Sequence, residues 1–382
     1  MPDAARVDGN DRLTQRRLRI VERPKLRVAD VAMFYGERSG GIRTYLDEKV
    51  RWAQRESLCE HHLIVPGAHE YHQAAAGSVR HELRALRVAA ANGYRIPAGS
   101  RSLQATLRLV RPDIVLFHDP FWRPLQVGQL VREAGGKVVM VHHGSAALDA
   151  GAFPGPQPLY TSAFRAWLRR TYAPADAVMS ACDPSGDAGR GADLELRFGL
   201  HPAFRPRRVA RGDHVLYVGR LAREKGIFTL LDATAGSRDS WPLELLGAGP
   251  AVDAVKAHVR RLGLSARVTF RQYVSDRREL AASYAAARCV VVPGANETFG
   301  LVAFEAAASG ASTVACATAP SAALLGPLAH TFAPDDPGGL LAAIEVARAS
   351  RPDHEAAAHF ADRHTWQAAF RAELADLEGL AR

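Results

Sequence analysis

The sequence predicts an α/β protein of two Rossmann-like domains that face each other across a cleft. The chain has 382 residues, which exceeds one typical domain and suits two domains of about 150–200 residues each. Short β-branched runs alternate with stretches of helical spacing, a pattern typical of parallel βαβ units. The second half of the chain repeats this alternation. Because ligands bind at the carboxyl ends of such strands, we expect functional residues directly after them.

The first half of the chain begins with a strand, a glycine turn and a helix. The turn is the pair at 40–41, and helical spacing follows at 42–56. The candidate strands of this half are 27–35 (RVADVAMFY), 60–65, 113–118 (DIVLFH), 137–142 (KVVMVH) and 177–181 (AVMSA). A segment rich in Pro and Arg at 199–211 then predicts a linker between the two domains.

The second half repeats the alternation and ends in a helix. Its candidate strands are 213–218, 243–246, 267–270, 289–292 and 313–315, with helices between them at 252–262, 278–287 and 301–309. The last segment, 362–380, predicts an amphipathic helix with Trp366, Phe370, Leu374 and Leu377 on one face. We therefore expect a disordered leader at 1–26, Rossmann-like domains at 27–200 and 201–361, and a C-terminal helix at 362–382 that can cross back to the first domain.

The composition limits the partners and the compartment. The formal net charge is +9, and this basicity favours anionic partners such as nucleotide diphosphates or anionic lipid surfaces. The sequence has neither zinc-finger spacing nor an aromatic-basic motif, so we expect no nucleic-acid partner. It also has no membrane-length apolar run, no apolar signal-peptide core in residues 1–27 and no C-x-x-C pair. These features predict a cytoplasmic protein without a zinc site or disulfide framework.

The most informative motif is the segment 296–305 (NETFGLVAFE). Glu297 follows a candidate buried strand, and Glu305 falls in the helix after it. Gly300 permits close approach of backbone N–H groups to a ligand, and the helix start favours negative charge. Carboxylates in this position suit hydrogen bonds from sugar hydroxyls. Taken alone, the two glutamates would also fit a helix cap and a solvated helix residue.

Two further motifs follow strands. In 217–226 (YVGRLAREKG), Arg220 offers a planar fork and Lys225 a point charge to a phosphate, although two exposed basic loop residues would look the same. In 39–44 (SGGIRT), Gly40 and Gly41 permit close backbone approach to a phosphate or sugar. A Gly-Gly pair is also commonly only a turn.

Together these segments resemble the retaining GT-B glycosyltransferases of family 4. The resemblance runs from residue 27 to residue 380 and includes the Gly-Gly-Ile loop, the G-R-L-x-x-E-K-G segment, the E-x-F-G-L-x-x-x-E signature, the L-L-G-A-G-P turn at 245–250 and the closing Trp-containing helix. The glutamate pair and the Arg/Lys pair are its specific parts. It implies transfer of a hexose-type sugar from a nucleotide-diphospho-sugar to an acceptor hydroxyl, with the acceptor on the N-terminal domain and the donor on the C-terminal domain.

The resemblance also implies a role for each motif residue. The donor diphosphate would contact Arg220, Lys225 and Gly41, and the nucleotide ribose would contact Glu305. The transferred sugar would contact Glu297 as a catalytic residue, and its hydroxyls would meet the backbone of Phe299, Gly300 and Leu301. The base would lie near Tyr273 and Val274, next to Gln272, where the family usually has Gly.

Histidines end two of the candidate strands. The resemblance matches His143 to a histidine that hydrogen-bonds a donor-sugar hydroxyl and helps to stabilise the transition state, so we predict that it is catalytic. Strand alternation sends His142 and His143 to opposite faces, so only one of them can face the cleft. A buried structural histidine is the alternative for His143. We expect His118 and Trp122 to shape the acceptor cleft.

The sequence has no D-x-D motif, whose carboxylates a metal-bridged diphosphate would favour. We therefore expect no metal and no cofactor beyond the nucleotide-sugar co-substrate, because Arg220 and Lys225 can neutralise the leaving group. Retention without an evident carboxylate nucleophile suggests attack on the same face, with the leaving phosphate helping to take the acceptor proton. The nucleotide (UDP, GDP or ADP), the sugar and the acceptor (a lipid, a glycan or a small metabolite) stay open.

Other classes of protein share parts of this pattern. A GT-B phosphorylase or a sugar-nucleotide epimerase shares the fold and the phosphate-binding residues. A Rossmann dehydrogenase needs Gly-x-Gly-x-x-Gly/Ala, and the segment 247–252 (GAGPAV) ends on Val252, so the match fails. A non-catalytic nucleotide-sugar-binding protein would carry the same motifs.

One helical segment bears on membrane contact. At 164–172, the residues Phe164, Trp167, Leu168 and Tyr172 share a stripe, with Arg165, Arg169 and Arg170 beside it. Such a surface can bind anionic lipid, which would make the protein peripheral on the inner face of the membrane. An ordinary helix whose aromatic stripe packs on the sheet fits the pattern as well.

Overall fold

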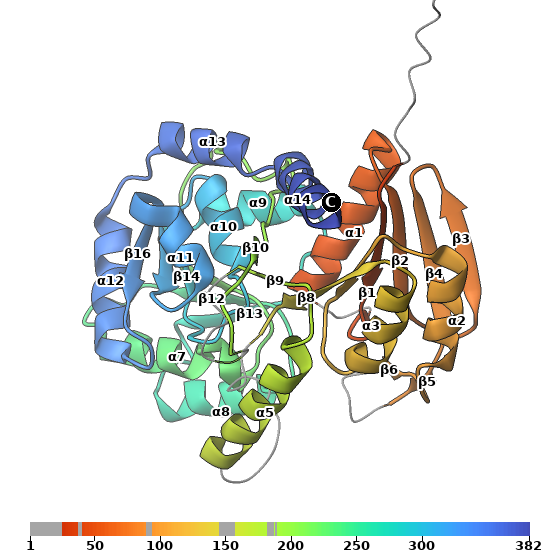
Figure 1. Ribbon diagram of the computed structural model, residues 1–382. Helices are drawn as coiled ribbons and strands as arrows, with labels where there is room; N and C mark the ends of the chain where they lie inside the picture. Colours follow the sequence, from red (N-terminus) through yellow and green to blue (C-terminus); the bar gives the residue numbers. More distant parts are fainter. Residues whose placement is uncertain (1–24, 37–39, 89–93, 145–156, 182–186, 188) are drawn as a thin grey trace, which may run out of the picture.

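The computed structural model describes residues 25–36, 40–88, 94–144, 157–181, 187 and 189–382, and the predicted leader falls almost entirely outside them. The chain forms two α/β lobes, coloured red to yellow and green to blue in Figure 1. Each lobe is built on its own sheet. This arrangement confirms the two α/β halves, each with a largely parallel sheet, that the sequence predicts.

The first lobe is built on a mixed sheet that has eight strands in the described part of the chain. In spatial order these are β10 (Leu194–Glu195), β9 (Ala177–Ser180), β8 (Lys137–His142), β7 (Ile114–Phe117), β1 (Arg27–Val31), β2 (Glu60–Gly67), β4 (Ser78–Arg84) and β3 (Tyr71–Ala75). All neighbours are parallel except β3, which pairs antiparallel with β4 at the edge. A small separate ladder joins β5 (Leu86–Arg87) to β6 (Arg95–Ile96). The central strands are buried on both faces, as apolar runs in parallel sheets require.

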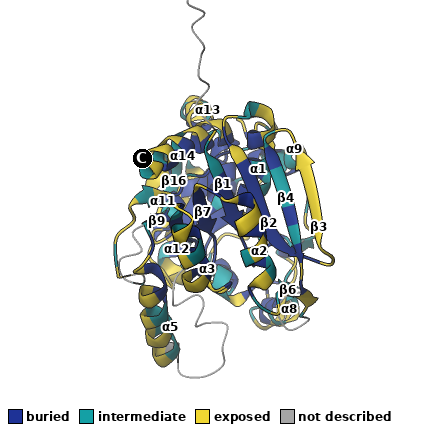
Figure 2. Cartoon of the chain, turned by 45° about the vertical axis from the view of Figure 1, so that its right-hand side comes forward, coloured by how far each residue is buried: buried dark blue, intermediate teal, exposed yellow. Residues whose placement is uncertain are grey.

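The helices of the first lobe follow its strands. They are α1 (Gly41–Glu56), α2 (Arg101–Val110), α3 (Pro124–Glu133) and α5 (Gln157–Tyr172). The first strand is shorter than the predicted 27–35, because the amide of Met33 donates to the Asp119 carboxylate (2.6 Å) instead of continuing the ladder. The sequence analysis did not predict β3, whose five residues are all exposed and include none that is β-branched (Figure 2).

The second lobe is built on a parallel sheet that has six strands in the described part of the chain. In spatial order they are β13 (Val268–Arg271), β12 (Leu243–Leu246), β11 (Val215–Val218), β14 (Cys289–Val292), β15 (Thr313–Cys316) and β16 (Ala329–Phe332). The helices around it are η2 (Arg223–Lys225), α7 (Ile227–Gly236), α8 (Val252–Arg261), α9 (Arg277–Ala286), α10 (Leu301–Ala308), α11 (Pro320–Leu325), η3 (Gly326–Leu328), α12 (Pro337–Ala349) and α13 (His354–Arg363). Five of these strands correspond to predicted segments, and β16 was not predicted.

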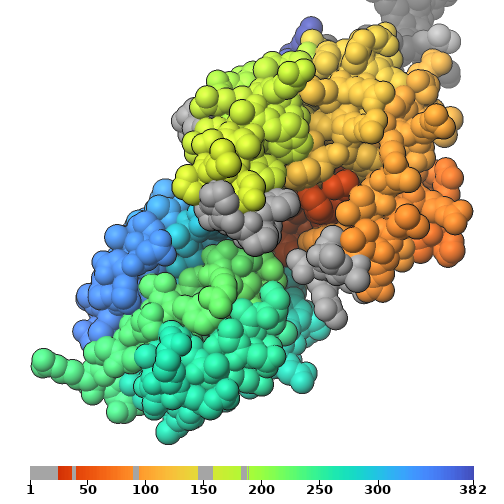
Figure 3. All heavy atoms as spheres, turned by 90° about the horizontal axis from the view of Figure 1, so that it is seen from below, coloured from red at the N-terminus to blue at the C-terminus, as the bar shows by residue number. Residues whose placement is uncertain are grey.

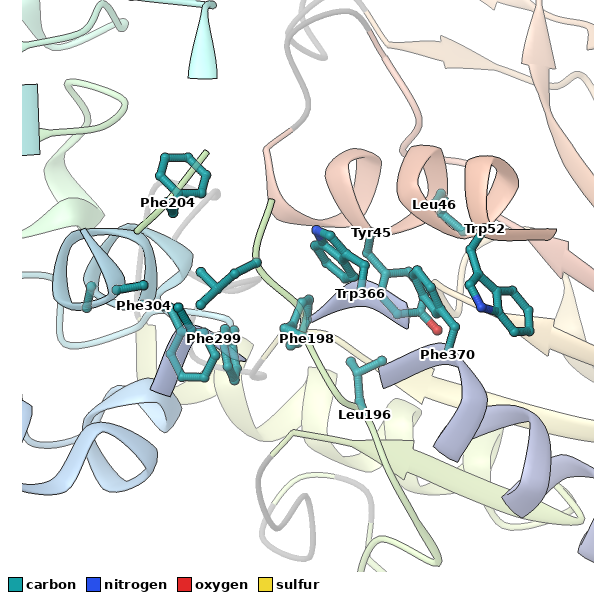
Figure 4. Packing of buried hydrophobic residues seen from close by; sticks show 14 of the residues in the cluster. Tyr45, Leu46, Trp52, Leu196, Phe198, Phe204, Phe299, Phe304, Trp366 and Phe370 are labelled. Carbon is teal, nitrogen blue, oxygen red and sulfur yellow. The ribbon is translucent and has the colours of Figure 1, made fainter. Parts of the chain in front are cut away.

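The last helix, α14 (Trp366–Ala381), packs beside α1 of the first lobe (Figure 1). It begins later than the predicted 362, because Thr365 caps it: the Thr365 hydroxyl accepts the amide of Ala368 at 3.1 Å. Aromatic side chains line this contact, and Figure 4 shows them running from α1 past α14 to the loop before α10. Tyr45 meets Phe370 with ring centroids 5.3 Å apart, and Phe198 stacks on Phe299 at 4.2 Å. One continuous apolar core therefore includes residues of both lobes.

A buried ion pair fixes α14 to α1. The ammonium of Lys49 lies 2.6 Å from Glu373 and 2.8 Å from Asp30, and all three side chains are buried. Tyr45 donates its hydroxyl to the other oxygen of Glu373. Burial alone would lower the pKa of Lys49, but the two carboxylates outweigh burial and raise it.

We expect Lys49→Met to destabilise the protein by about 3–5 kcal/mol, because it leaves two buried carboxylates without their cation. The free energy of unfolding in a denaturant titration measures this. The matched control is Arg371→Met, which removes the partly exposed pair of Arg371 with Glu56 (2.7 Å) between the same two helices. Exposed pairs contribute at most about 1 kcal/mol, so equal losses in the two variants would contradict the assignment.

Candidate functional site

The loops after β11 and β14 lie against each other. Gly226 has φ +67°, and a Cβ there would come within 2.4 Å of the Pro293 carbonyl oxygen. Only glycine tolerates both this backbone conformation and this contact. The close approach brings the end of η2 beside the segment that carries Glu297. Two motifs that are far apart in the sequence therefore form one edge of the second lobe.

Charged side chains of both motifs meet at this edge. The ammonium of Lys225 lies 2.8 Å from a carboxylate oxygen of Glu297, and both side chains are partly exposed. Arg220 pairs with Glu224 on the same loop, and its side chain is nearly half exposed. The two cations predicted to contact a diphosphate are therefore partly exposed, and each is paired with a carboxylate.

The loop before α10 turns at Gly300, which has φ +92°. The amide of Ser321 donates to the Phe299 carbonyl at 2.8 Å and anchors this turn. The Phe299 side chain is buried against Phe198, so the residue can meet a ligand only through its backbone, as the prediction for residues 299–301 requires. Leu301 faces the first lobe, where a Cβ on Gly41 would lie 3.5 Å from its side chain.

The Gly-Gly turn and this loop therefore meet across the interface between the lobes. The first residue of that motif, Ser39, lies outside the described residues. Figure 3 shows a hollow between the lobes, with the red N-terminal part of the described chain at its floor. Gly41 begins α1, so backbone groups of one lobe and the charged edge of the other face the same space.

The second glutamate of the motif is buried in the second lobe. Glu305 accepts a hydrogen bond from the Tyr284 hydroxyl (3.0 Å), and its other oxygen lies 3.3 Å from the Arg277 guanidinium. Burial raises the pKa of Glu305 to about 7, and Arg277 and Tyr284 offset only part of that effect. Sequence reasoning missed Tyr284 and Arg277, because nothing in their local pattern marks them as partners of a residue more than twenty positions away.

The residues predicted to meet a base follow β13. Tyr273 is 63% exposed, and Val274 is partly buried against the core. An exposed phenol ring offers a flat surface on which a planar base can stack. The structure thus places Tyr273 on the surface, in the loop just before α9, the helix that carries Tyr284.

His142 and His143 point to opposite faces of the sheet, as strand alternation predicts. His142 points to α5, where it lies 3.2 Å from the Tyr172 hydroxyl. His143 points the other way and lies 2.8 Å from His118. Burial, His118 and His142 together hold the pKa of His143 well below its ordinary value, so the ring is neutral. The His143 Nδ1 atom is buried without a hydrogen-bond partner among the described residues.

Two residues expected in the acceptor cleft lie elsewhere. Trp122 is only 3% exposed, packs in the core of the first lobe and donates its indole N–H to the Gly99 carbonyl at 3.1 Å. The His118 side chain is fully buried between Asp30 and His143. Both predictions of cleft surface are therefore wrong. Packing in the apolar core holds Trp122, and hydrogen bonds to Asp30 and His143 occupy both ring nitrogens of His118.

The aromatic stripe of α5 also faces inward. Leu168 and Tyr172 are buried, and Phe164 and Trp167 pack against the core of the first lobe. The alternative of an ordinary packed helix therefore holds for these four residues. The outer face of α5 carries Arg169 and Arg170, which are exposed.

Three further expectations concern metal sites, membrane-spanning helices and cysteines, and the structure bears on them within the described residues. In that part of the chain, no group of three or more His, Cys, Asp or Glu side chains is arranged to hold a metal ion. No helix there has the length and apolarity needed to span a bilayer. Three of the four cysteines are free and buried, and Cys182 lies outside the described residues.

Comparison with known proteins connects this geometry to a family. Residues 205–351 match the family described as "Glycosyl transferases group 1", and residues 39–189 match "Glycosyltransferase Family 4". The chain is 31% identical to the GDP-mannose-dependent alpha-(1-6)-phosphatidylinositol dimannoside mannosyltransferase of Mycobacterium tuberculosis, over 93% of this chain and 97% of that protein. It is 28% identical to the glycogen synthase of the same species over 66% of each protein.

Solved structures share the fold at lower identity. Sucrose-phosphate synthase from Thermosynechococcus elongatus superposes with a TM-score of 0.72 at 19% identity, over 93% of this chain and 99% of that chain. HepE of Anabaena in complex with UDP superposes with a TM-score of 0.68 at 17% identity, over 93% of this chain and 100% of that chain. The protein therefore belongs to family 4 of the GT-B glycosyltransferases and transfers a hexose from a nucleotide sugar to an acceptor.

Proposed function

We propose that this glycosyltransferase is retaining and metal-independent, takes mannose from GDP-mannose and delivers it to an anionic inositol-containing lipid. The observation that carries the chemistry is the edge formed by Lys225 and Glu297. The loop of Glu297 continues to Leu301, which meets Gly41 of the other lobe. The choice of donor and acceptor is supported by the mycobacterial relative, whose name gives both and which matches this chain over nearly its whole length.

In the proposed complex, the diphosphate lies between the lobes. Arg220 and Lys225 neutralise its charge, and Lys225 leaves Glu297 to do so. The start of α1 at Gly41 approaches the phosphates, because a residue without a side chain leaves its backbone open there. The ribose hydroxyls donate to Glu305, and the base stacks on Tyr273 beside Val274. These assignments agree with the exposure of Arg220, Lys225 and Tyr273.

The sugar lies against the turn before α10 and the end of β8. The backbone of Phe299, Gly300 and Leu301 holds its hydroxyls, Glu297 contacts it after release from Lys225, and His143 bonds another hydroxyl. The bond from the anomeric carbon to the phosphate oxygen breaks while the bond to the acceptor oxygen forms on the same face. The acceptor proton passes to the leaving phosphate. Arg220 and Lys225 stabilise the charge that develops on that phosphate, so no metal is needed.

A donor panel tests this function. We expect the purified protein with EDTA to transfer mannose from GDP-mannose to phosphatidylinositol mannoside, and to use UDP- and ADP-hexoses far less well. NMR of the product reports the anomer, which we expect to be α, as in the donor. Loss of activity in EDTA that Mg²⁺ or Mn²⁺ restores would contradict the metal-free mechanism, and an inverted product would contradict retention.

The same assay tests the role of Lys225. We expect Lys225→Met to lower kcat by about 10²–10³-fold, a typical effect of removing one group that stabilises transition-state charge. Lys256→Met is the matched control, because Lys256 is an exposed lysine on α8 of the same lobe. Similar kcat values for Lys225→Met and the wild type would remove Lys225 from the site.

The raised pKa of Glu305 predicts a pH dependence of nucleotide binding. The ionised carboxylate is the stronger acceptor for a ribose hydroxyl, and with a pKa of about 7 Glu305 is only about half ionised at pH 7 in the free protein. We therefore expect the affinity for GDP, measured by calorimetry, to rise as the pH increases from 6 to 8. Glu305→Gln should lose this rise and bind GDP more weakly by about 1.5–3 kcal/mol at pH 8. A wild-type affinity that is flat over this range, or unchanged in the variant, would contradict the ribose assignment.

We further propose that the first lobe contacts an anionic membrane through the outer face of α5, at the cytoplasmic side where the lipid acceptor would be reached. Its arginines Arg169 and Arg170 are exposed, and Leu159 near the start of the helix is 64% exposed. Basic residues near an anionic surface contribute about 1 kcal/mol each. The relative's lipid substrate supports this surface as a docking face.

Vesicle co-sedimentation tests the membrane contact. We expect binding to anionic vesicles at low salt, loss of binding at high salt and weak binding to neutral vesicles. Arg170→Glu should reduce binding, whereas Arg238→Glu, an exposed arginine of the other lobe, should not. Equal binding of the two variants would contradict the proposed face.

A further inference from the structure

A chain of buried polar groups runs beneath the end of the first sheet. Asp30 on β1 lies 2.7 Å from His118 Nε2, and His118 Nδ1 lies 2.8 Å from His143 Nε2. The two imidazole rings are nearly coplanar, with an interplanar angle of 22° and centroids 5.1 Å apart. This separation is too long for rings stacked face to face and suits two rings joined edge to edge. The contact is therefore a hydrogen bond in the plane of both rings.

Asp30 determines which ring nitrogen carries the proton in each histidine of this hydrogen-bonded series. Burial alone would raise the pKa of Asp30, but Lys49 and the hydrogen bonds from His118 and His61 outweigh burial and hold it well below its ordinary value. The carboxylate can therefore only accept, so the proton of His118 must sit on Nε2. In a neutral imidazole the other nitrogen is then an acceptor. With His118 in this neutral form, His143 donates to that nitrogen from Nε2.

These hydrogen bonds leave His143 Nδ1 without a proton, as an acceptor that has no donor. The atom is buried and has no partner in the described part of the chain. Buried polar atoms of this kind are rare in folded proteins and call for an explanation. The ring cannot meet the need by taking a second proton, because burial and the neighbouring His118 disfavour its cation. An outside donor, such as a hydroxyl, would satisfy it.

The other groups around Asp30 keep it charged, and none of them has a hydrogen bond to His143 among the described residues. Lys49 bonds both Asp30 and Glu373, and Tyr45 donates to Glu373. His61 occupies the second oxygen of Asp30 at 2.7 Å and bonds Ser78 through its other nitrogen at 3.0 Å. His61 and His118 are thus two fully buried imidazoles on one carboxylate, and only His118 continues to His143.

We propose that Asp30 and His118 are positioning residues that hold His143 in the tautomer protonated on Nε2, so that Nδ1 accepts a hydrogen bond from a hydroxyl of the transferred sugar. This rests on the proposed function, which puts the sugar beside His143. A hydroxyl that donates to Nδ1 gains electron density on its oxygen. That density opposes the positive charge that develops on the sugar ring as the bond to phosphate breaks.

The pair of histidines on Asp30 supplies a matched experiment. His118→Leu removes the acceptor for His143 Nε2, His118→Asn keeps an amide that can accept at a similar position, and His61→Leu removes an equally buried imidazole that does not reach His143. Nitrogen NMR of histidine-labelled protein reports which ring nitrogen of His143 carries the proton. Thermal melting of each variant reports its stability.

We expect His143 of the wild type to carry its proton on Nε2, and His118→Leu to lose that preference. In the same variant kcat should fall by about tenfold or more while the donor KM changes by less than about threefold, because only the transition-state interaction is lost. His118→Asn should recover much of kcat, and His61→Leu should retain the wild-type tautomer and lose far less kcat at similar cost in stability.

Two results would overturn the inference. One is a wild-type His143 that is protonated on Nδ1, which the NMR detects without turnover. The other is an equal loss of kcat in His118→Leu and His61→Leu, which would mean that both histidines act only through stability. Failure of the proposed reaction is seen separately, as a wild-type protein that does not transfer mannose at all.

Discussion

The structure depends on one buried ion cluster, in which Lys49 of α1 lies between Asp30 of β1 and Glu373 of α14. Without the Lys49 ammonium, the two buried carboxylates would be desolvated charges that lack their cation. The cluster therefore fixes the last helix of the chain against the first lobe. It also keeps Asp30 ionised, and through Asp30 it orients the histidines at the end of the same sheet.

The site itself is assembled by close backbone approach. A side chain at Gly226 would collide with Pro293, and one at Gly300 would collide with Ser321. Because both positions also have positive φ, substitution there would strain the backbone as well as displace the loops. These contacts place Lys225 of one loop beside Glu297 of another. Gly41 then presents the start of α1 to the same region from the other lobe, so both lobes contribute to the proposed donor site.

The sequence was sufficient for the features that are local. The alternation of strands and helices and the segments 217–226 and 296–305 lie within short windows of the sequence. The two segments follow β11 and β14, as predicted. Features that depend on long-range packing were missed. Tyr45 and Glu373 are 328 positions apart, and no local pattern connects them. Trp122 was misplaced for the same reason, since an aromatic residue looks alike in sequence whether it faces a cleft or the core. The same ambiguity left two interpretations open for the stripe of α5, and the structure supports the packed helix.

The central claim is that the donor diphosphate binds where Lys225 now meets Glu297. A crystal structure of the protein with bound GDP tests it most directly. The account predicts that the terminal phosphate lies within hydrogen-bond distance of Arg220 and Lys225, that Lys225 has left Glu297, and that a ribose hydroxyl bonds Glu305. A nucleotide bound elsewhere, with the 2.8 Å pair of Lys225 and Glu297 intact, would contradict it.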